Sequence, residues 1–248
     1  MNLYNIAIFG APRSGTTWLG QLFNSSPNTL YRFQPLFSYE FKNRLTTTSS
    51  KYDIQNFNLD LINAQSQFTL TDLSFPKNSL THLVWKEVRY HHITPNLLQN
   101  SNTKIIYIER DPINVINSWY NASSEFNPKW DIQKEWLNAP FKNLNKPEEF
   151  NGFNKWLEVK NIHTLNSQNH PDKVIKVKYE DLKLNPIKEL KKLYKFCNLK
   201  WDIQVENFIT DSTTKHEKDP YSVFKSQNQT LTLPKNIVSS INQYFQKK

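Results

Sequence analysis

The chain has 248 residues, of which 38% are hydrophobic, and its 31 Lys and Arg outnumber its 22 Asp and Glu, which gives a net charge of +9. This size suits one domain with a large core, and the single cysteine, Cys197, excludes an internal disulfide or a cysteine-based zinc site. Apolar runs are short, Met1 is followed almost at once by a strand, and the lysines are scattered without a recognisable nucleic-acid module. We therefore expect one cytoplasmic domain over residues 1–248 that binds neither a membrane nor nucleic acid.

Short apolar runs alternate with amphipathic segments along the whole chain. The runs predict strands at residues 5–9, 30–34, 82–88, 104–109 and 173–179. The amphipathic segments predict helices at residues 16–25, 95–100, 112–122, 150–168, 186–197 and 235–246. Because strands and helices alternate, we expect an α/β fold with a mainly parallel central sheet covered by helices on both faces. Ligands of such sheets bind beyond the carboxyl ends of the strands.

The first strand runs into the loop Gly10-Ala11-Pro12-Arg13-Ser14-Gly15-Thr16-Thr17-Trp18. A glycine-bounded loop between a strand and a helix directs backbone N–H groups and a helix N-terminus at one point, which suits a phosphate or a sulfate. The common nucleotide loop has a lysine after its second glycine, whereas this chain has Thr16 there and carries its cation, Arg13, inside the loop. This difference argues against an ordinary ATP or GTP hydrolase.

A second motif follows the fourth predicted strand. Arg110-Asp111-Pro112 stands where this strand ends and a helix begins, and Ser118 lies eight residues after Arg110. A guanidinium can bind a phosphate through two parallel hydrogen bonds, and a serine hydroxyl can donate a third. Taken alone, Arg-Asp-Pro would more often form a surface salt bridge than a ligand site.

Both motifs resemble those of sulfotransferases that use 3′-phosphoadenosine-5′-phosphosulfate (PAPS). Residues 12–18 resemble the 5′-phosphosulfate loop of this family, the Arg-x7-Ser pattern resembles its 3′-phosphate motif, and Tyr179-Glu180-Asp181-Leu182 resembles the corner whose tyrosine lies near the adenine. The resemblance implies a single P-loop-like domain, PAPS as the sulfuryl donor, 3′-phosphoadenosine-5′-phosphate (PAP) as its product, and no metal. The nucleotide-binding residues that it implies are Arg13, Ser14, Gly15, Thr16, Thr17, Trp18, Arg110, Ser118 and Tyr179.

Sulfuryl transfer in this family implies cations at the bridging oxygen and a base for the acceptor hydroxyl. Arg13 and Lys86 stand at the family's cationic positions, but Val88 and Gln34 occupy the positions of its known bases. The nearby titratable residues Glu87 and His91 are the first candidates for the base, and Glu40 is a further one.

The acceptor is expected to be a small molecule or a glycan. Residues 20–27 and 31–35 resemble carbohydrate sulfotransferases, and residues 119–150 contain Trp119, Trp130 and Trp136, whose rings could stack on a sugar. Residues 212–225, with Lys215, Tyr221 and Lys225, are expected to close over the nucleotide. Two other functions stay open, a P-loop kinase of a small metabolite and a protein that binds PAP or PAPS without catalysis. The oligomeric state is not predicted.

Overall fold

Five parallel strands form the central sheet of the protein. The computed structural model describes residues 3–64, 73–215, 223 and 230–247, and the sheet order is β2-β3-β1-β4-β5. The strands are β1 (Tyr4–Phe9), β2 (Thr29–Phe33), β3 (His82–Glu87), β4 (Lys104–Glu109) and β5 (Val174–Lys178). Their paired registers are all parallel, which confirms the predicted α/β fold and places five carboxyl ends along one edge of the sheet.

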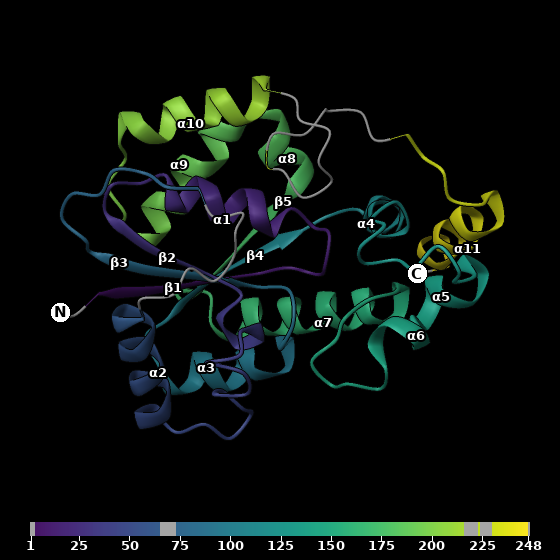
Figure 1. Cartoon of the computed structure of the whole chain (residues 1–248), viewed down its shortest axis with the longest axis horizontal. Helices are drawn as coiled ribbons and strands as arrows, with labels where there is room; N and C mark the ends of the chain where they lie inside the picture. The colour runs from purple at the N-terminus through teal and green to yellow at the C-terminus, as the bar shows by residue number, and fades with distance from the viewer. Residues whose placement is uncertain (1–2, 65–72, 216–222, 224–229, 248) are drawn as a thin grey trace.

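Helices cover both faces of the sheet (Figure 1). One layer holds α1 (Thr16–Asn24), α8 (Tyr179–Leu184), α9 (Pro186–Cys197) and α10 (Ile203–Thr214). The other layer holds α2 (Lys51–Asn63), α3 (Thr94–Asn100) and much of α7 (Phe153–Asn169). Beyond the carboxyl ends of the strands lie α4 (Pro112–Tyr120), α5 (Ile132–Asn138), α6 (Pro140–Asn143) and α11 (Lys235–Gln246). Two short 3-10 helices, η1 (Pro35–Phe37) and η2 (His91–Ile93), follow β2 and β3.

The inner strands β1 and β4 are mostly apolar on both faces, because helices cover both faces of the sheet there. In β1, Ile6 and Ile8 pack toward α1 and α9, whereas Ala7 and Phe9 pack toward α2 and α3. Each fully buried aliphatic or aromatic side chain contributes roughly 1.5–3 kcal/mol of transfer free energy, so the two cores fix the register of the sheet. Successive residues of a strand point to opposite faces, and this alternation decides which polar side chains of β3 can meet.

Several helices were not predicted from the sequence. The helix α2 begins after a capping box in which the Ser50 hydroxyl accepts from the Asp53 N–H and the Asp53 carboxylate accepts from the Ser50 N–H. No helix is predicted from the sequence in this part of the chain. The helix α10 begins at a similar cap, the Asp202 carboxylate, which accepts from the Gln204 N–H. Caps of this kind occur in turns as well, so the polar residues alone did not reveal these helices.

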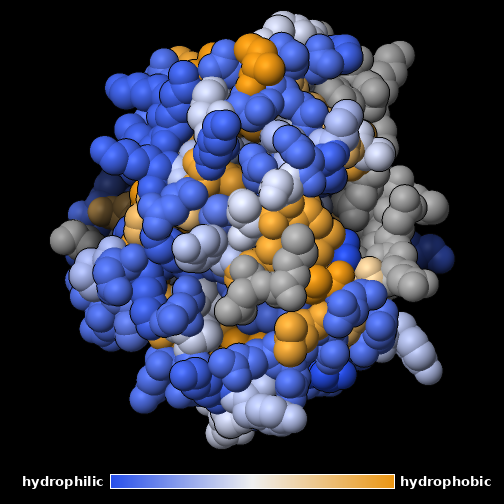
Figure 2. Space-filling model, turned by 90° about the vertical axis from the view of Figure 1, so that its left-hand side faces the viewer, coloured by the Kyte–Doolittle hydropathy of each residue, from blue (hydrophilic) through white to orange (hydrophobic). Residues whose placement is uncertain are grey.

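The surface at the amino ends of the strands is mostly hydrophilic. Figure 2 shows this side of the molecule, where the largest group of apolar residues lies near the middle of the face. Within the described residues, no helix is both long enough and apolar enough to cross a bilayer.

Candidate active site

The loop between β1 and α1 has two residues in the left-handed region. Arg13 has a φ of 70° and Gly15 has a φ of 91°. A left-handed backbone is unfavourable for a residue with a side chain, so the conformation of Arg13 is the kind of strain that concentrates at functional sites. Gly15 is the N-cap of α1, and no described side chain caps this helix. The first turn of α1 therefore directs N–H groups outward, where an anion can accept from them.

Ser14 and Gly15 show that the loop is tightly packed. The Ser14 side chain is buried, and its hydroxyl meets no hydrogen-bond partner among the described residues. A Cβ atom on Gly15 would lie only 2.4 Å from the Tyr179 ring. The loop thus combines a buried polar group with a backbone that approaches a ring closely. Both features fit a loop that holds an anion next to the Tyr179 ring.

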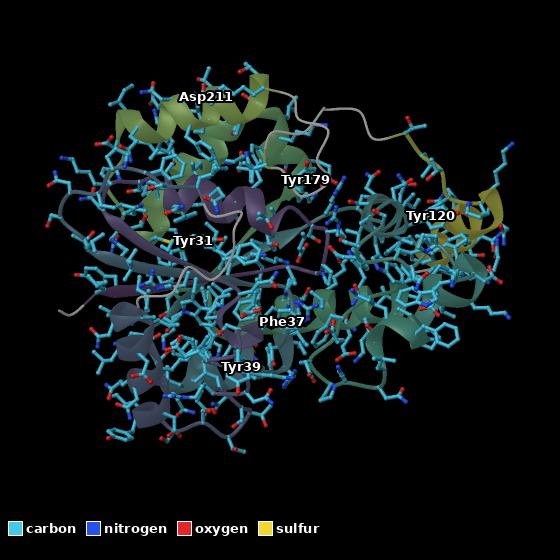
Figure 3. All side chains as sticks on the ribbon, viewed as in Figure 1. Tyr31, Phe37, Tyr39, Tyr120, Tyr179 and Asp211 are labelled. Carbon is cyan, nitrogen blue, oxygen red and sulfur yellow. The ribbon has the colours of Figure 1, made fainter. Side chains whose placement is uncertain are left out.

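Tyr179 joins the loop to the second motif. Its ring meets Trp18 edge to face at 6.2 Å, and the Arg110 guanidinium carbon lies 4.5 Å from the ring centre. Figure 3 shows Tyr179 near α8, whereas Tyr120 lies farther from the sheet, in the region of α4 and α11. The predicted adenine-side residue is therefore in contact with residues of both phosphate motifs.

A hydrogen bond links the two motifs directly. Arg110 Nη1 donates to the Arg13 backbone oxygen at 2.9 Å, and Trp156 Nε1 donates to the Arg110 backbone oxygen at 3.1 Å. Burial lowers the pKa of Arg110 from its ordinary value. The arginines of the first and second motifs thus lie at one site rather than on different surfaces.

The Arg13 side chain extends from the loop toward α4. Its Nε donates to the Ser118 hydroxyl at 3.2 Å, and its Nη1 donates to Glu125 Oε1 at 3.0 Å. The structure therefore brings Arg13, Ser118 and Arg110 together. Glu125 was not among the residues predicted from the sequence, because it lies in an irregular segment after α4 and is remote from Arg13 along the chain.

Lys86 lies at the end of β3 under the first turn of α1. Only 1% of the residue is exposed, its Nζ is 3.4 Å from Thr17 Oγ1, and the same Nζ lies 3.8 Å from the centre of the Phe33 ring. The ring and the hydroxyl hold the ammonium group beside the loop. Thr16 is buried next to Thr17 in the same turn. Lys86 is thus placed at the loop, as the sequence suggested.

Glu87 and His91 lie elsewhere. Glu87 points to the opposite face of β3, where its Oε1 accepts from the Leu36 N–H at 2.8 Å, and burial raises its pKa to about 8. His91 is fully buried, its Nδ1 is 3.3 Å from His163 Nε2, and burial lowers its pKa well below the ordinary value. This placement does not support either residue as the base. The alternation of β3 separates Glu87 from Lys86, and His91 follows Glu87 to the same side.

The remaining predicted residues contribute less to this geometry. Glu40 lies on an exposed turn after η1. Trp119 is a core residue whose ring packs edge to face on Phe126 at 5.1 Å, so the structure gives it no open face for a sugar. Trp130 and Trp136 are partly buried against the same core.

The predicted closing segment is described only in part. Trp18 Nε1 donates to the Ser212 hydroxyl at 3.0 Å, which ties α10 to α1 beside the loop. Lys215 forms an ion pair with Asp211 at 3.0 Å. Tyr221 and Lys225 lie outside the described residues.

A second cluster that the sequence did not indicate lies beside Lys86. Arg89 Nε donates to Glu149 Oε1 at 2.7 Å, its Nη1 donates to Gln34 Oε1 at 3.4 Å, and its guanidinium lies 3.8 Å from the Phe37 ring centre. Phe37 is half exposed. The cluster adjoins the end of β3, because the Gln34 N–H donates to the Lys86 backbone oxygen at 2.9 Å. Across the described residues, no group of three or more His, Cys, Asp or Glu is arranged to hold a metal ion.

Comparisons with known proteins agree with this geometry. Cytosolic sulfotransferase 14 of Arabidopsis thaliana is 27% identical over 199 residues, which cover 79% of this chain and 54% of that protein. Cytosolic sulfotransferase 15 of the same plant is 27% identical over 79% of this chain and 51% of that protein. The chain therefore spans about half the length of these curated relatives.

Solved structures of sulfotransferases share the fold. A mouse sulfotransferase complexed with PAP has a TM-score of 0.56 at 15% identity and covers 98% of this chain and 81% of its own. The sulfotransferase domain from the curacin biosynthetic pathway has a TM-score of 0.54 at 18% identity and covers 99% and 98%. The family model described as "Sulfotransferase domain" matches residues 4–248. From the two phosphate motifs, the parallel sheet that joins them and this match, we conclude that the chain belongs to the sulfotransferase family.

Proposed function

We propose that the protein transfers a sulfuryl group from PAPS to the hydroxyl of a small-molecule acceptor, with the domain extending over residues 1–248. The hydrogen bond from Arg110 to the Arg13 backbone oxygen carries the proposal, because it brings an anion loop and a second phosphate motif to one site. A ligand with phosphates at the 3′ and 5′ positions of one ribose fits such a pair of motifs. The mouse relative, which is complexed with PAP, supports the same nucleotide for this chain.

Each residue of the site has a proposed role. Ser14, Gly15, Thr16, Thr17 and Trp18 hold the 5′-phosphate with backbone N–H groups and hydroxyls at the start of α1. Arg110 and Ser118 hold the 3′-phosphate, and the adenine lies against Tyr179. These residues fix the donor so that an acceptor oxygen can approach the sulfur in line with the bond that breaks.

Two cationic side chains are proposed to stabilise the leaving oxygen. Bound PAPS supplies a sulfuryl group whose departure leaves negative charge on a phosphate oxygen. Arg13 and Lys86 are proposed to stabilise this charge, since both lie at the loop and Lys86 is already withdrawn from water. The position of Lys86 is set before the reaction by Thr17 and the Phe33 ring, so this cation needs little reorganisation.

We further propose that the acceptor is a carbohydrate and that the protein is cytoplasmic. The first proposal rests on the resemblance of residues 20–27 and 31–35 to carbohydrate sulfotransferases, and on the partly exposed cluster of Phe37 and Arg89 beside Lys86. The second rests on the cytosolic Arabidopsis relatives. Because the chain spans about half of those relatives, the activity of the whole protein is itself part of the proposal.

Assays of ligand binding and of sulfuryl transfer distinguish a sulfotransferase from a kinase and from a non-catalytic binding protein. We expect PAP to raise the melting temperature without magnesium, and labelled PAPS to pass its sulfuryl group to members of a panel of sugars, phenols and alcohols. Stabilisation by ATP only with magnesium would instead identify a kinase. Stabilisation by PAP without transfer to any acceptor would identify a binding protein. The absence of any effect of PAP would refute the proposal.

A further inference from the structure

We propose that Glu125 is the base that takes the proton from the acceptor hydroxyl. This inference rests on the sulfuryl transfer proposed above and supplies the group that the sequence did not reveal. The Glu125 carboxylate is bound to the cation of the phosphosulfate loop, with Oε1 at 3.0 Å from Arg13 Nη1. A carboxylate in this place lies next to the group that handles the sulfuryl donor, and that is where an acceptor oxygen must arrive.

The position of Glu125 is fixed by the segment that follows α4. The Glu125 and Phe126 N–H groups both donate to the Ala122 oxygen at 2.8 Å, which makes a tight turn. Phe126 is buried and packs edge to face against Trp119 at 5.1 Å and against Tyr120 at 5.2 Å. The buried ring anchors the turn, and the adjacent carboxylate is left at the surface of the site.

The Arg13–Glu125 ion pair is exposed enough for a ligand to replace one of its members. The Arg13 side chain is 12% exposed and that of Glu125 is 26% exposed, so the ion pair is accessible to a ligand. A phosphosulfate bound in the loop competes with the carboxylate for Arg13 because both are anions. When the ligand takes over the hydrogen bonds of Arg13, a carboxylate oxygen becomes available within the site.

Three other acidic side chains have partners away from Arg13, and the first is Glu109, whose Oε1 lies 3.8 Å from both Lys176 Nζ and His163 Nδ1. Glu87 bonds to the Leu36 N–H on the opposite face of the sheet. Glu149 accepts from Arg89 at 2.7 Å and from Asn151 at 3.3 Å. Glu125 is thus the carboxylate whose partner is the loop cation itself.

The proposed step is balanced. The acceptor O–H proton passes to a Glu125 carboxylate oxygen while the acceptor oxygen forms a bond to sulfur. The bond between sulfur and the bridging oxygen breaks, and its electron pair stays on the departing phosphate, next to Arg13 and Lys86. The proton later leaves Glu125 for water, which restores the carboxylate.

The test uses Glu125→Gln, which keeps the size of the side chain but cannot take up a proton. We expect transfer to an aliphatic alcohol to fall on the order of 100-fold or more, the usual contribution of a general base. We expect affinity for PAP to stay the same or to rise a few-fold, since a competing anion has been removed. Glu125→Asp should keep part of the turnover. Glu158→Gln, a surface control in which Glu158 pairs with Lys155, should match wild type.

A second acceptor separates proton removal from a structural role. An acidic phenol that is already ionised in mildly alkaline solution needs no base, so Glu125→Gln should transfer to it at close to the wild-type rate. Wild-type turnover of the alcohol by Glu125→Gln would overturn the inference. A parallel loss of PAP affinity, alcohol transfer and phenol transfer would also overturn it, since Glu125 would then only position Arg13.

These outcomes differ from a failure of the proposed function. If wild-type protein does not bind PAP, the sulfotransferase proposal fails and this inference fails with it. If wild type binds PAP and transfers to both acceptors while Glu125→Gln does the same, only the role of Glu125 is lost.

Discussion

Arg110→Ala should weaken the binding of PAP much more than the binding of adenosine 5′-monophosphate. The two ligands differ only in the 3′-phosphate, which Arg110 is proposed to bind. Two charge-assisted hydrogen bonds to a phosphate contribute about 3–5 kcal/mol, so the Kd for PAP should rise about 100-fold to several-thousand-fold.

The same variant also removes contacts that do not involve the 3′-phosphate. Arg110 donates to the Arg13 backbone oxygen at 2.9 Å and lies 4.5 Å from the Tyr179 ring centre. Together these contacts contribute about 1–1.5 kcal/mol, so adenosine 5′-monophosphate should lose no more than about tenfold in affinity.

Titration calorimetry of both ligands with wild type and variant gives the four affinities needed for this comparison. Arg44→Ala serves as a control, because Arg44 is an exposed arginine that pairs with Asp60 beside α2. An equal loss for the two ligands would refute the role of Arg110 in binding the 3′-phosphate.

Three further variants test other parts of the site and the core. Gly15→Ala forces a side chain into a left-handed backbone and against Tyr179, so the free energy of unfolding should fall by at least about 1–2 kcal/mol and PAP affinity should drop; an unchanged melting temperature would contradict the close packing. Lys86→Met keeps the buried stem but removes the ammonium group beside Thr17, so turnover should fall about 100- to 1,000-fold with little change in PAP affinity; retained turnover would exclude Lys86 from catalysis. Burial raises the pKa of Glu87 from 4.5 to about 8, so between these pH values the folded state holds a proton that the unfolded state releases. The free energy of unfolding should therefore fall as the pH rises through this range, by up to ~1.4 kcal/mol per pH unit. Denaturation of Glu87→Gln at several pH values should show a flatter dependence, and parallel curves for the two proteins would show that Glu87 does not cause it.

The sequence predicted the frame of the site because its signals are local. A buried strand, a loop with glycines and a helix start all lie within residues 5–25, and the second motif is equally continuous around Arg110. Parallel pairing then places the carboxyl ends together, so Arg13, Arg110 and Tyr179 converge without any long-range information.

The groups that complete the site depend on packing that no local pattern records. Glu125 pairs with Arg13, which lies 112 residues earlier in the chain, because the turn that Phe126 anchors lies beside the loop. Glu87 was chosen as a base for its closeness to Lys86 along the chain, but neighbours in a strand face opposite sides. The first case needed a tertiary contact, and the second needed the strand to continue as far as Glu87.

The contact between Gly15 and Tyr179 constrains how related sequences can diverge. The two positions are 164 residues apart, yet a methyl group at the first would occupy space that the ring fills at the second. A homologue that acquires alanine or serine at position 15 must therefore carry a smaller or displaced side chain at position 179. Across many relatives, this pair of sites should change together or not at all.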